Sequence, residues 1–254
     1  REVDFLPLLL LSAPFHVLAV GLRALRWRHL TEPIAPLSRG SLFRATSIGF
    51  AVNNLLPLRI GELVRVWALA REHGVSAGAV LGTVVLERML DVASVLLLAV
   101  GALAWLGTGG EGGGVLQQGS RLLIPVAVAP LLGLLVLRVA PDPTIRLAVF
   151  CLRPFPAAFA RFGERALRSF ISGLAALRGG RHLFWIALHS LTIWLVASTV
   201  PLLVGLWAFG VELGGPLDTL LTSWVLLGAI GVAVAIPSAP GFVGPYQLAF
   251  SAVL

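Results

Sequence analysis

The sequence predicts an all-α protein, a polytopic transmembrane helical bundle with two broken or re-entrant segments. Of its 254 residues, 57% are hydrophobic and only 12% are charged, whereas soluble domains carry about 45–50% apolar and about 25% charged residues. At roughly 20 residues a span, this length allows about six or seven crossings. We expect one integral membrane domain over residues 1–254, and the composition excludes a soluble enzyme.

The apolar stretches follow one another along the chain. Residues 5–25 form the first expected span, which Arg23, Arg26 and Trp27 would close as interfacial anchors. Residues 75–106 form a helix of roughly 48 Å, longer than the about 30 Å hydrocarbon core, so it must tilt, kink or project. The remaining expected spans are residues 122–137, 184–209 and 217–236.

The basic residues predict orientation. All 19 are arginine, and the formal net charge is +7. In a membrane protein, anionic headgroups and cytoplasmic loops account for this excess, so we expect no nucleic-acid partner. Residues 23–44 and 138–181 are arginine-rich and should be cytoplasmic in a multi-pass protein of the cell membrane. Residues 141–181 should form a basic amphipathic connection, either on the membrane surface or on the protein's own cytoplasmic face.

The first interrupted segment lies within residues 45–72, which this orientation turns into a re-entrant hairpin. Pro57 and Gly61 break its helix, and the freed backbone groups are tolerated only against protein or a watery cavity. Glu62 and Arg65 could pair on a helix that restarts at Gly61, whose free amides would suit a phosphate. The alternative is a cytoplasmic loop with ordinary interfacial arginines.

The second polar feature lies inside the long helix. Glu87 and Asp91 are one turn apart, and Arg88 lies within about 100° of both around the axis. Charges at membrane depth cost about 2.5–3.5 kcal/mol each and usually mark a pathway or a site. Arg88 could be neutralised in place or could bind a phosphate bidentately. The alternatives are a structural ion-pair network and snorkelling at the interface.

The second interrupted segment is residues 237–247, where Pro240, Gly241 and Gly244 exclude a regular helix. Pro240 and Gly244 repeat the spacing of Pro57 and Gly61. Paired breaks indicate a transporter's binding site and an inverted repeat. We expect no cofactor and no metal site, and we interpret the scattered histidines as interfacial or core residues: His16, His29, His73, His182 and His189.

Several motifs together carry a resemblance to a known family. They are Leu25-Arg26-Trp27, Asn54-Leu-Leu-Pro57-Leu-Arg59-Ile-Gly61-Glu62-Leu-Val-Arg65, Glu87-Arg88-Met-Leu-Asp91 and Pro240-Gly241-Phe-Val-Gly244. In this order they resemble the lysylphosphatidylglycerol synthase transmembrane region family, the flippase-like domain of multiple-peptide-resistance proteins and their stand-alone relatives. The resemblance runs from about residue 20 to the end, although both ends look short for the family.

The resemblance implies a protein that moves a lipid between leaflets and is not an enzyme, because the soluble aminoacyl-transferase domain of the bifunctional members is not expected here. The substrate would be an anionic or aminoacylated phospholipid or a polyprenyl-phosphate lipid. Gln247 stands where the family often has glutamate, which favours an anionic headgroup. The candidate binding residues are Asn54, Arg59, Glu62, Arg65, Glu87, Arg88, Asp91 and Gln247.

Two other functions compete with a translocator. One is a membrane-embedded glycosyl or phosphoryl transferase that acts on a polyprenyl-phosphate-linked substrate, with Glu62, Glu87 or Asp91 as base or metal ligand. The other is a scaffold whose buried charges only hold helices together. A second copy of the chain or a separate lipid-modifying enzyme would be the protein partner.

Overall fold

The computed structural model describes residues 5–56, 60–106, 128–129, 132–133, 135–136, 139–152, 164, 168, 180–211, 213–235 and 240–254. The regular structure of these residues is helical, without a strand, which confirms the all-α class. Four of the helical segments are long and apolar enough to cross a membrane, which confirms a multi-pass membrane protein: Leu8–Thr31, Ala77–Leu106, Gly180–Ala208 and Pro216–Val234.

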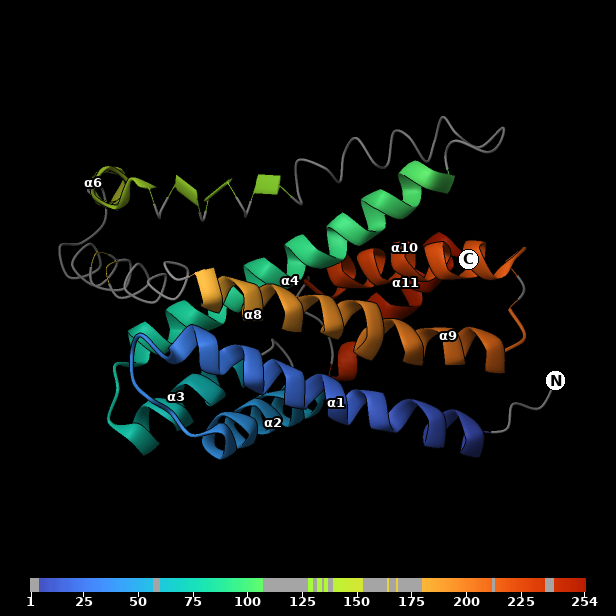
Figure 1. Ribbon diagram of the computed structural model, residues 1–254, viewed down its shortest axis with the longest axis horizontal. Coiled ribbons are helices and arrows are strands. Elements are labelled where there is room, and N and C mark those ends of the chain that lie inside the picture. The colour runs from blue at the N-terminus through green and yellow to red at the C-terminus, as the bar shows by residue number, and fades with distance from the viewer. Residues whose placement is uncertain are drawn as a thin grey trace.

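Three long helical segments run lengthwise through the molecule (Figure 1). They are α1 (Phe5–Thr31), α4 (Ala77–Leu106) and the segment formed by α8 (Gly180–Thr192) and α9 (Thr199–Ala208). α1 packs against α4, α8 and α9. The expected first span ends too early, because α1 continues through Arg23 and Arg26 to Thr31.

α2 (Arg39–Leu55) and α3 (Gly61–His73) pack against each other as an antiparallel hairpin. Their 17 and 13 residues give lengths of about 25 and 20 Å, less than the thickness of a hydrocarbon core. The backbones lie close together, because a Cβ on Gly61 would overlap the carbonyl oxygen of Gly49. This geometry suits a re-entrant hairpin, and its entry into a membrane stays a prediction. Pro57 lies outside the described residues.

A π-helical turn, Ile193–Ser198, joins α8 to α9. Pro201 explains its position, because proline has no N–H to donate to residue 197 and its ring would collide with that carbonyl in a regular α-helix. The wider turn relieves this conflict, and Thr199 Oγ1 donates to the Trp194 carbonyl at 2.7 Å. The sequence predicted one continuous span here and missed the turn, which aims Trp194 and Ser198 at a cavity.

The chain breaks again after α10 (Pro216–Ala235). A short 3-10 turn, η4 (Pro240–Phe242), precedes α11 (Pro245–Val253). Gly241 and Gly244 have φ values of 67° and 98°, which glycine adopts without strain. This agrees with the predicted interruption at Gly241 and Gly244, although residues 245–247 already belong to α11. η4 packs against α2 (Figure 1), so the two interrupted segments meet, and an inverted repeat stays a prediction.

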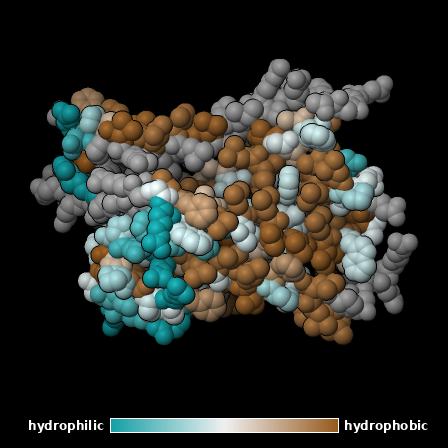
Figure 2. Space-filling model, viewed as in Figure 1, coloured by the Kyte–Doolittle hydropathy of each residue, from teal (hydrophilic) through white to brown (hydrophobic). Residues whose placement is uncertain are grey.

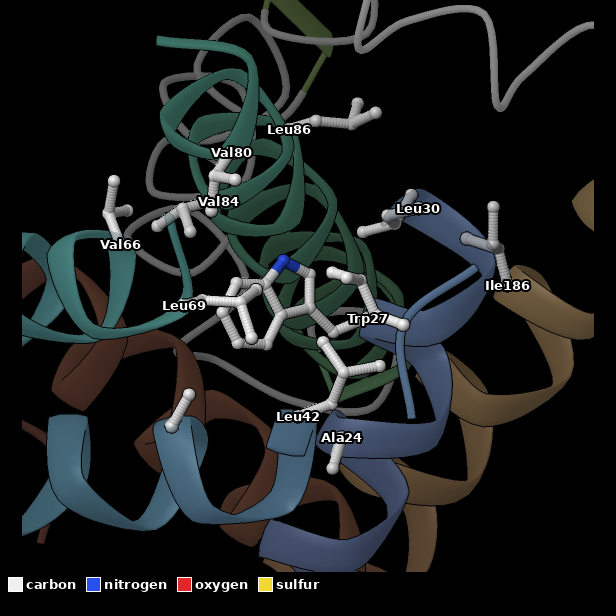
Figure 3. Packing of buried hydrophobic residues seen from close by; sticks show 12 residues of the cluster. Ala24, Trp27, Leu30, Leu42, Val66, Leu69, Val80, Val84, Leu86 and Ile186 are labelled. Atoms are coloured by element: carbon white, nitrogen blue, oxygen red, sulfur yellow. The ribbon is translucent and has the colours of Figure 1, made fainter. Parts of the chain in front are cut away.

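The largest cluster of buried apolar residues in the described part of the chain contains Trp27 (Figure 3). Trp27 is fully buried, and its Nε1 donates to Thr83 Oγ1 at 2.9 Å. The cluster to which it belongs contains side chains from five helices: Ala24, Leu30, Leu42, Val66, Leu69, Val80, Val84, Leu86 and Ile186. Much of the remaining surface is apolar (Figure 2), as a lipid-facing protein requires.

Most of the expected basic connection lies outside the described residues. Within residues 141–181, α6 (Pro141–Leu152) is described. Apart from residues 164 and 168, the expected amphipathic helix over 157–177 lies outside the described residues, as does most of the span expected over 122–137.

Candidate functional site

Charged side chains from three helices meet inside the molecule. α1 contributes two arginines, α3 a glutamate and an arginine, and α4 the predicted acid–arginine–acid group. Ion pairs connect them into one network. We call this network the charge cluster, and its members are Arg23, Arg26, Glu62, Arg65, Glu87, Arg88 and Asp91.

Glu87 is a hub of the charge cluster and is completely buried. Its carboxylate accepts hydrogen bonds from Arg65 Nη2 at 3.0 Å and from Arg88 Nη2 at 2.7 Å. Arg26 Nη2 lies 3.4 Å from the same carboxylate. Because burial makes an unpaired carboxylate costly, these three arginines explain how Glu87 remains ionised there.

Asp91 is the second hub, one turn further along α4. Arg26 Nη1 lies 2.8 Å and Arg88 Nη2 also 2.8 Å from its oxygens, and Arg23 Nη1 lies at 3.2 Å. Trp194 Nε1 donates to Asp91 Oδ1 at 3.3 Å, which ties the π-helical turn to the charge cluster. Ion pairs and one hydrogen bond therefore join α1, α3, α4 and the π-helical turn, and whether these charges also bind a ligand stays a prediction.

The arginine side chains of the charge cluster differ in their exposure to solvent. The Arg26 side chain is fully buried, those of Arg65 and Arg23 are 4% and 11% exposed, and that of Arg88 is 28% exposed. Arg65 Nε and Arg88 Nε are buried atoms without a hydrogen-bond partner among the described residues. A guanidinium N–H buried without an acceptor is costly, and Arg88, whose side chain is the most exposed of the four, is the arginine best placed to contact an anion.

Five members of the charge cluster line a cavity of about 790 Å³, namely Arg23, Glu62, Arg65, Arg88 and Asp91. Further polar side chains of its lining are those of His16, Thr46, Asn53, Asn54, Ser198 and Tyr246. The other walls come mostly from apolar side chains of α4, α9, α10 and α11, including Val92, Val95, Leu202, Leu227, Ile230 and Phe250. The cavity can therefore take a molecule that is polar at one end and apolar at the other.

Aromatic rings hold two of the cavity arginines in place. The Arg65 guanidinium carbon lies 4.7 Å from the Trp27 ring centroid. That of Arg23 lies 5.7 Å from Phe50 and 5.5 Å from Trp194. Cation–π contacts of this kind favour a fixed guanidinium position, so a ligand would meet preoriented donors.

The hairpin turn borders the same cavity. α3 begins at Gly61 as predicted, and the Gly61 amide donates to Asn53 Oδ1 at 2.8 Å. One of the amides expected to face a phosphate is therefore occupied by Asn53. Asn54, which also lines the cavity, donates from Nδ2 to the Phe50 carbonyl at 2.9 Å.

The remaining predicted residues lie in different places. Glu62, Arg65, Arg88 and Asp91 line the cavity, and Glu87 lies behind them. Arg59 lies outside the described residues. Gln247 is exposed, and its Oε1 accepts a hydrogen bond from the Gly244 amide at 2.7 Å, which caps α11. Gln247 is not among the cavity-lining residues. Its contact with a headgroup stays a prediction.

Arg23 and Arg26 were missed as site residues, because arginines beside a tryptophan at the end of an apolar stretch are typical of an interface. Their expected anchoring role is wrong for Arg26, which is fully buried. Their spacing of three residues was the available signal, since it places both on one face of a helix.

Comparisons with known proteins agree with this fold. Glycosyltransferase AglD of Haloferax volcanii is 26% identical over 263 residues, an alignment that covers 94% of this chain and 42% of the relative. The chain thus spans less than half the length of that relative. No solved structure matches the present chain. The family model described as "Lysylphosphatidylglycerol synthase TM region" matches residues 1–254. The protein therefore belongs to the lysylphosphatidylglycerol synthase transmembrane region family.

Proposed function

We propose that the protein is a lipid translocator that moves a lipid with a polar or phosphate headgroup between the leaflets of a membrane. One observation carries this proposal: a single cavity joins an arginine-rich polar end to apolar walls. A phosphorylated headgroup would contact Arg23, Arg65 and Arg88, and the first part of the tails would follow the apolar walls.

The charge balance favours an anionic headgroup. The charge cluster holds four guanidinium groups and three carboxylates, which leaves one positive charge. A phosphate would neutralise it and accept hydrogen bonds from the Arg88 guanidinium, the most exposed of the four. A cationic aminoacyl group would have to rely on Glu62, because Glu87 and Asp91 are already shared among arginines.

The position of the cavity suits passage of a headgroup. Asn54 at the end of α2 and Phe242 of η4 both line it, so it lies where the two interrupted segments approach each other. A charged headgroup is strongly disfavoured in hydrocarbon, and a polar cavity beside broken helices lowers that barrier.

A membrane-embedded glycosyl or phosphoryl transferase acting on a polyprenyl-phosphate-linked substrate is the second candidate. The relative named as a glycosyltransferase favours it. The carboxylate geometry argues against it, because a general base or metal ligand must have a free lone pair. Glu87 and Asp91 each pair with three arginines, and Glu62 pairs with Arg88.

The test is a scramblase-type assay in proteoliposomes that hold fluorescent phosphatidylglycerol or a labelled polyprenyl phosphate in one leaflet. We expect Arg88→Ala to slow lipid movement at least about tenfold, and Arg88→Lys to retain part of the rate because it keeps the charge. Arg44→Ala is the matched control, since Arg44 is an exposed arginine on α2 that pairs with Glu72 outside the cavity.

The same samples separate the two functions. Lipid recovered from the vesicles should be chemically unchanged when analysed by mass spectrometry. Equal movement in the wild type, Arg88→Ala and protein-free vesicles would contradict translocation, whereas a transferred sugar or phosphate that depends on Glu62 would establish the transferase.

A further inference from the structure

A second group of side chains lies at the junction of α1 and α8, away from the cavity. We propose that His29, Glu32 and His182 bind a divalent metal ion of the zinc type. His29 belongs to the last turn of α1, Glu32 follows that helix, and His182 is in the first turn of α8. None of the three is among the cavity-lining residues, so this site is separate from the one proposed for the lipid.

The distances suit a shared ion better than hydrogen bonds. His29 Nδ1 and His182 Nδ1 lie 4.0 and 3.5 Å from the same oxygen, Glu32 Oε2. Both distances exceed the about 2.9 Å of a hydrogen bond. Zinc ligands at about 2.0–2.1 Å in a tetrahedron are separated by roughly 3.3–3.4 Å. All three ligand atoms lie within 4.8 Å of one another, so a small contraction would complete the geometry.

The two imidazole nitrogens have no other role among the described residues. His29 Nδ1 and His182 Nδ1 are both buried atoms without a hydrogen-bond partner. A cation bound between these two nitrogens and the Glu32 oxygen would give both nitrogens the partner that they lack. The side chains of His29, His182 and Glu32 are 20%, 34% and 48% exposed, which leaves an entry path for the ion and a fourth coordination position for water.

Neighbouring rings hold His29 in this orientation. Its ring stacks on Trp185, with centroids 6.2 Å apart and planes 5° from parallel. On α8, His189 lies 5.6 Å from it, and the His189 Nδ1 atom is engaged with the Trp185 carbonyl at 2.6 Å. Outer contacts that fix ligand orientation are typical of metal sites.

The ion would stabilise the attachment of α1 to α8 next to the charge cluster. Arg26 lies three residues before His29 and donates from Nη1 to Ser190 Oγ of α8 at 3.0 Å. A metal bridge one turn away would hold the same two helices together. We therefore assign the ion a structural role, because its ligands join two helices and do not reach the cavity.

The test measures zinc binding to the detergent-purified protein without a histidine tag. Metal is removed with a chelator and zinc is returned by titration, with zinc content and Tm as readouts. We expect about one zinc per chain, a Tm that falls on chelation and recovers with zinc, and an affinity at least about tenfold lower in His182→Gln and in Glu32→Gln. Cobalt should give the visible absorption of a tetrahedral site.

His73→Gln is the matched control. His73 lies 3.7 Å from the Glu72 carboxylate but belongs to no three-ligand group found among the described residues, so its loss should leave zinc affinity unchanged. The proposal is wrong if the wild type binds no stoichiometric zinc, or if His182→Gln and Glu32→Gln bind it as tightly as the wild type. The chelation arm uses the wild type alone, so poor folding of a variant cannot hide the first result.

Discussion

Two regions of the molecule are held together by different means. The hairpin region, formed by the C-terminal half of α1 with α2, α3 and the N-terminal half of α4, contains Trp27 and most of the charge cluster. The α10 region, where α10 packs against the C-terminal half of α4, relies on small residues. A Cβ on Gly228 would lie 2.5 Å from that of Ala99, and one on Gly231 would lie 3.2 Å from Val95.

The difference follows from the environment of each region. Polar surface gathers over the hairpin region, whereas brown apolar surface covers most of the rest (Figure 2). Between lipid-facing helices the hydrophobic effect gives little association energy, so close approach through glycine and alanine replaces it. The hairpin region instead has buried ion pairs and hydrogen bonds. The cavity lies where these two kinds of packing meet.

Removing the charge of Glu87 should lower the Tm more than the other substitutions, because Glu87 pairs with three arginines of the hairpin region. Glu87→Gln keeps the volume but leaves Arg26, Arg65 and Arg88 without their shared carboxylate. Breaking a buried ion pair costs about 3–5 kcal/mol, so we expect a large fall in Tm in detergent. The same change at Glu72, whose side chain is 41% exposed, is the control. Equal Tm values for the two variants would contradict the role of Glu87 as a hub.

The α10 region should be sensitive to a single methyl group. In Gly228→Ala the new Cβ would meet Ala99 Cβ at 2.5 Å, and overpacking of this kind costs about 1–3 kcal/mol. Gly101→Ala on α4 adds the same methyl group with no described atom within 4 Å, and alanine is the better helix former. Thermal unfolding should rank Gly101→Ala at or above the wild type and Gly228→Ala below it. The reverse order would show that small-residue packing does not stabilise this region.

Trp27→Phe tests the neutral polar contacts of the hairpin region. It removes the Nε1 hydrogen bond to Thr83, worth about 1 kcal/mol, while the Thr83 hydroxyl still donates to the Val80 carbonyl at 2.7 Å. Trp207→Phe on α9 is the control, because Trp207 is 70% exposed. We expect a lower Tm for Trp27→Phe alone. Equal Tm values for the two variants would contradict a stabilising role of the Trp27 side chain.

The sequence predicted the helices better than their contacts. Long apolar stretches predict spans because hydrocarbon admits little else, and α4 and α10 closely follow their predicted ranges. The spacing of Glu87, Arg88 and Asp91 placed three of the seven charge-cluster residues together on one helix. Local spacing carries no information about which distant side chain completes a site, so Arg26 was assigned to an interface.

The histidines illustrate the same limit. His29 and His182 are separated by most of the chain, and only the packing of α1 against α8 brings them to one carboxylate. The π-helical turn was missed for a different reason. Pro201 was visible in the sequence, but a proline in an apolar stretch is compatible with a kink, a break or a π turn, and tertiary packing decides among them.

The smallest expected change in Tm comes from the outer edge of the hairpin region, where the polar side chains that contact one another are exposed to solvent. Glu72 accepts a hydrogen bond from Ser41 Oγ at 2.8 Å and pairs with Arg44 Nη2 at 2.6 Å. The Ser41 hydrogen bond and the Arg44 charge lower the pKa of Glu72 below its ordinary value of 4.5. The stabilisation is therefore complete above that value and is lost as the pH falls towards the folded-state pKa.

Other carboxylates also titrate in acid, so the informative quantity is the Tm difference between the wild type and Glu72→Gln. We expect a small difference at about pH 6 that shrinks as the pH is lowered to about 4 and below. High salt should reduce it as well, because the Glu72–Arg44 pair is largely exposed. A difference that stays constant with pH would mean that the Glu72 carboxylate charge does not stabilise the hairpin, and that the polar contribution of this region is confined to its buried side chains.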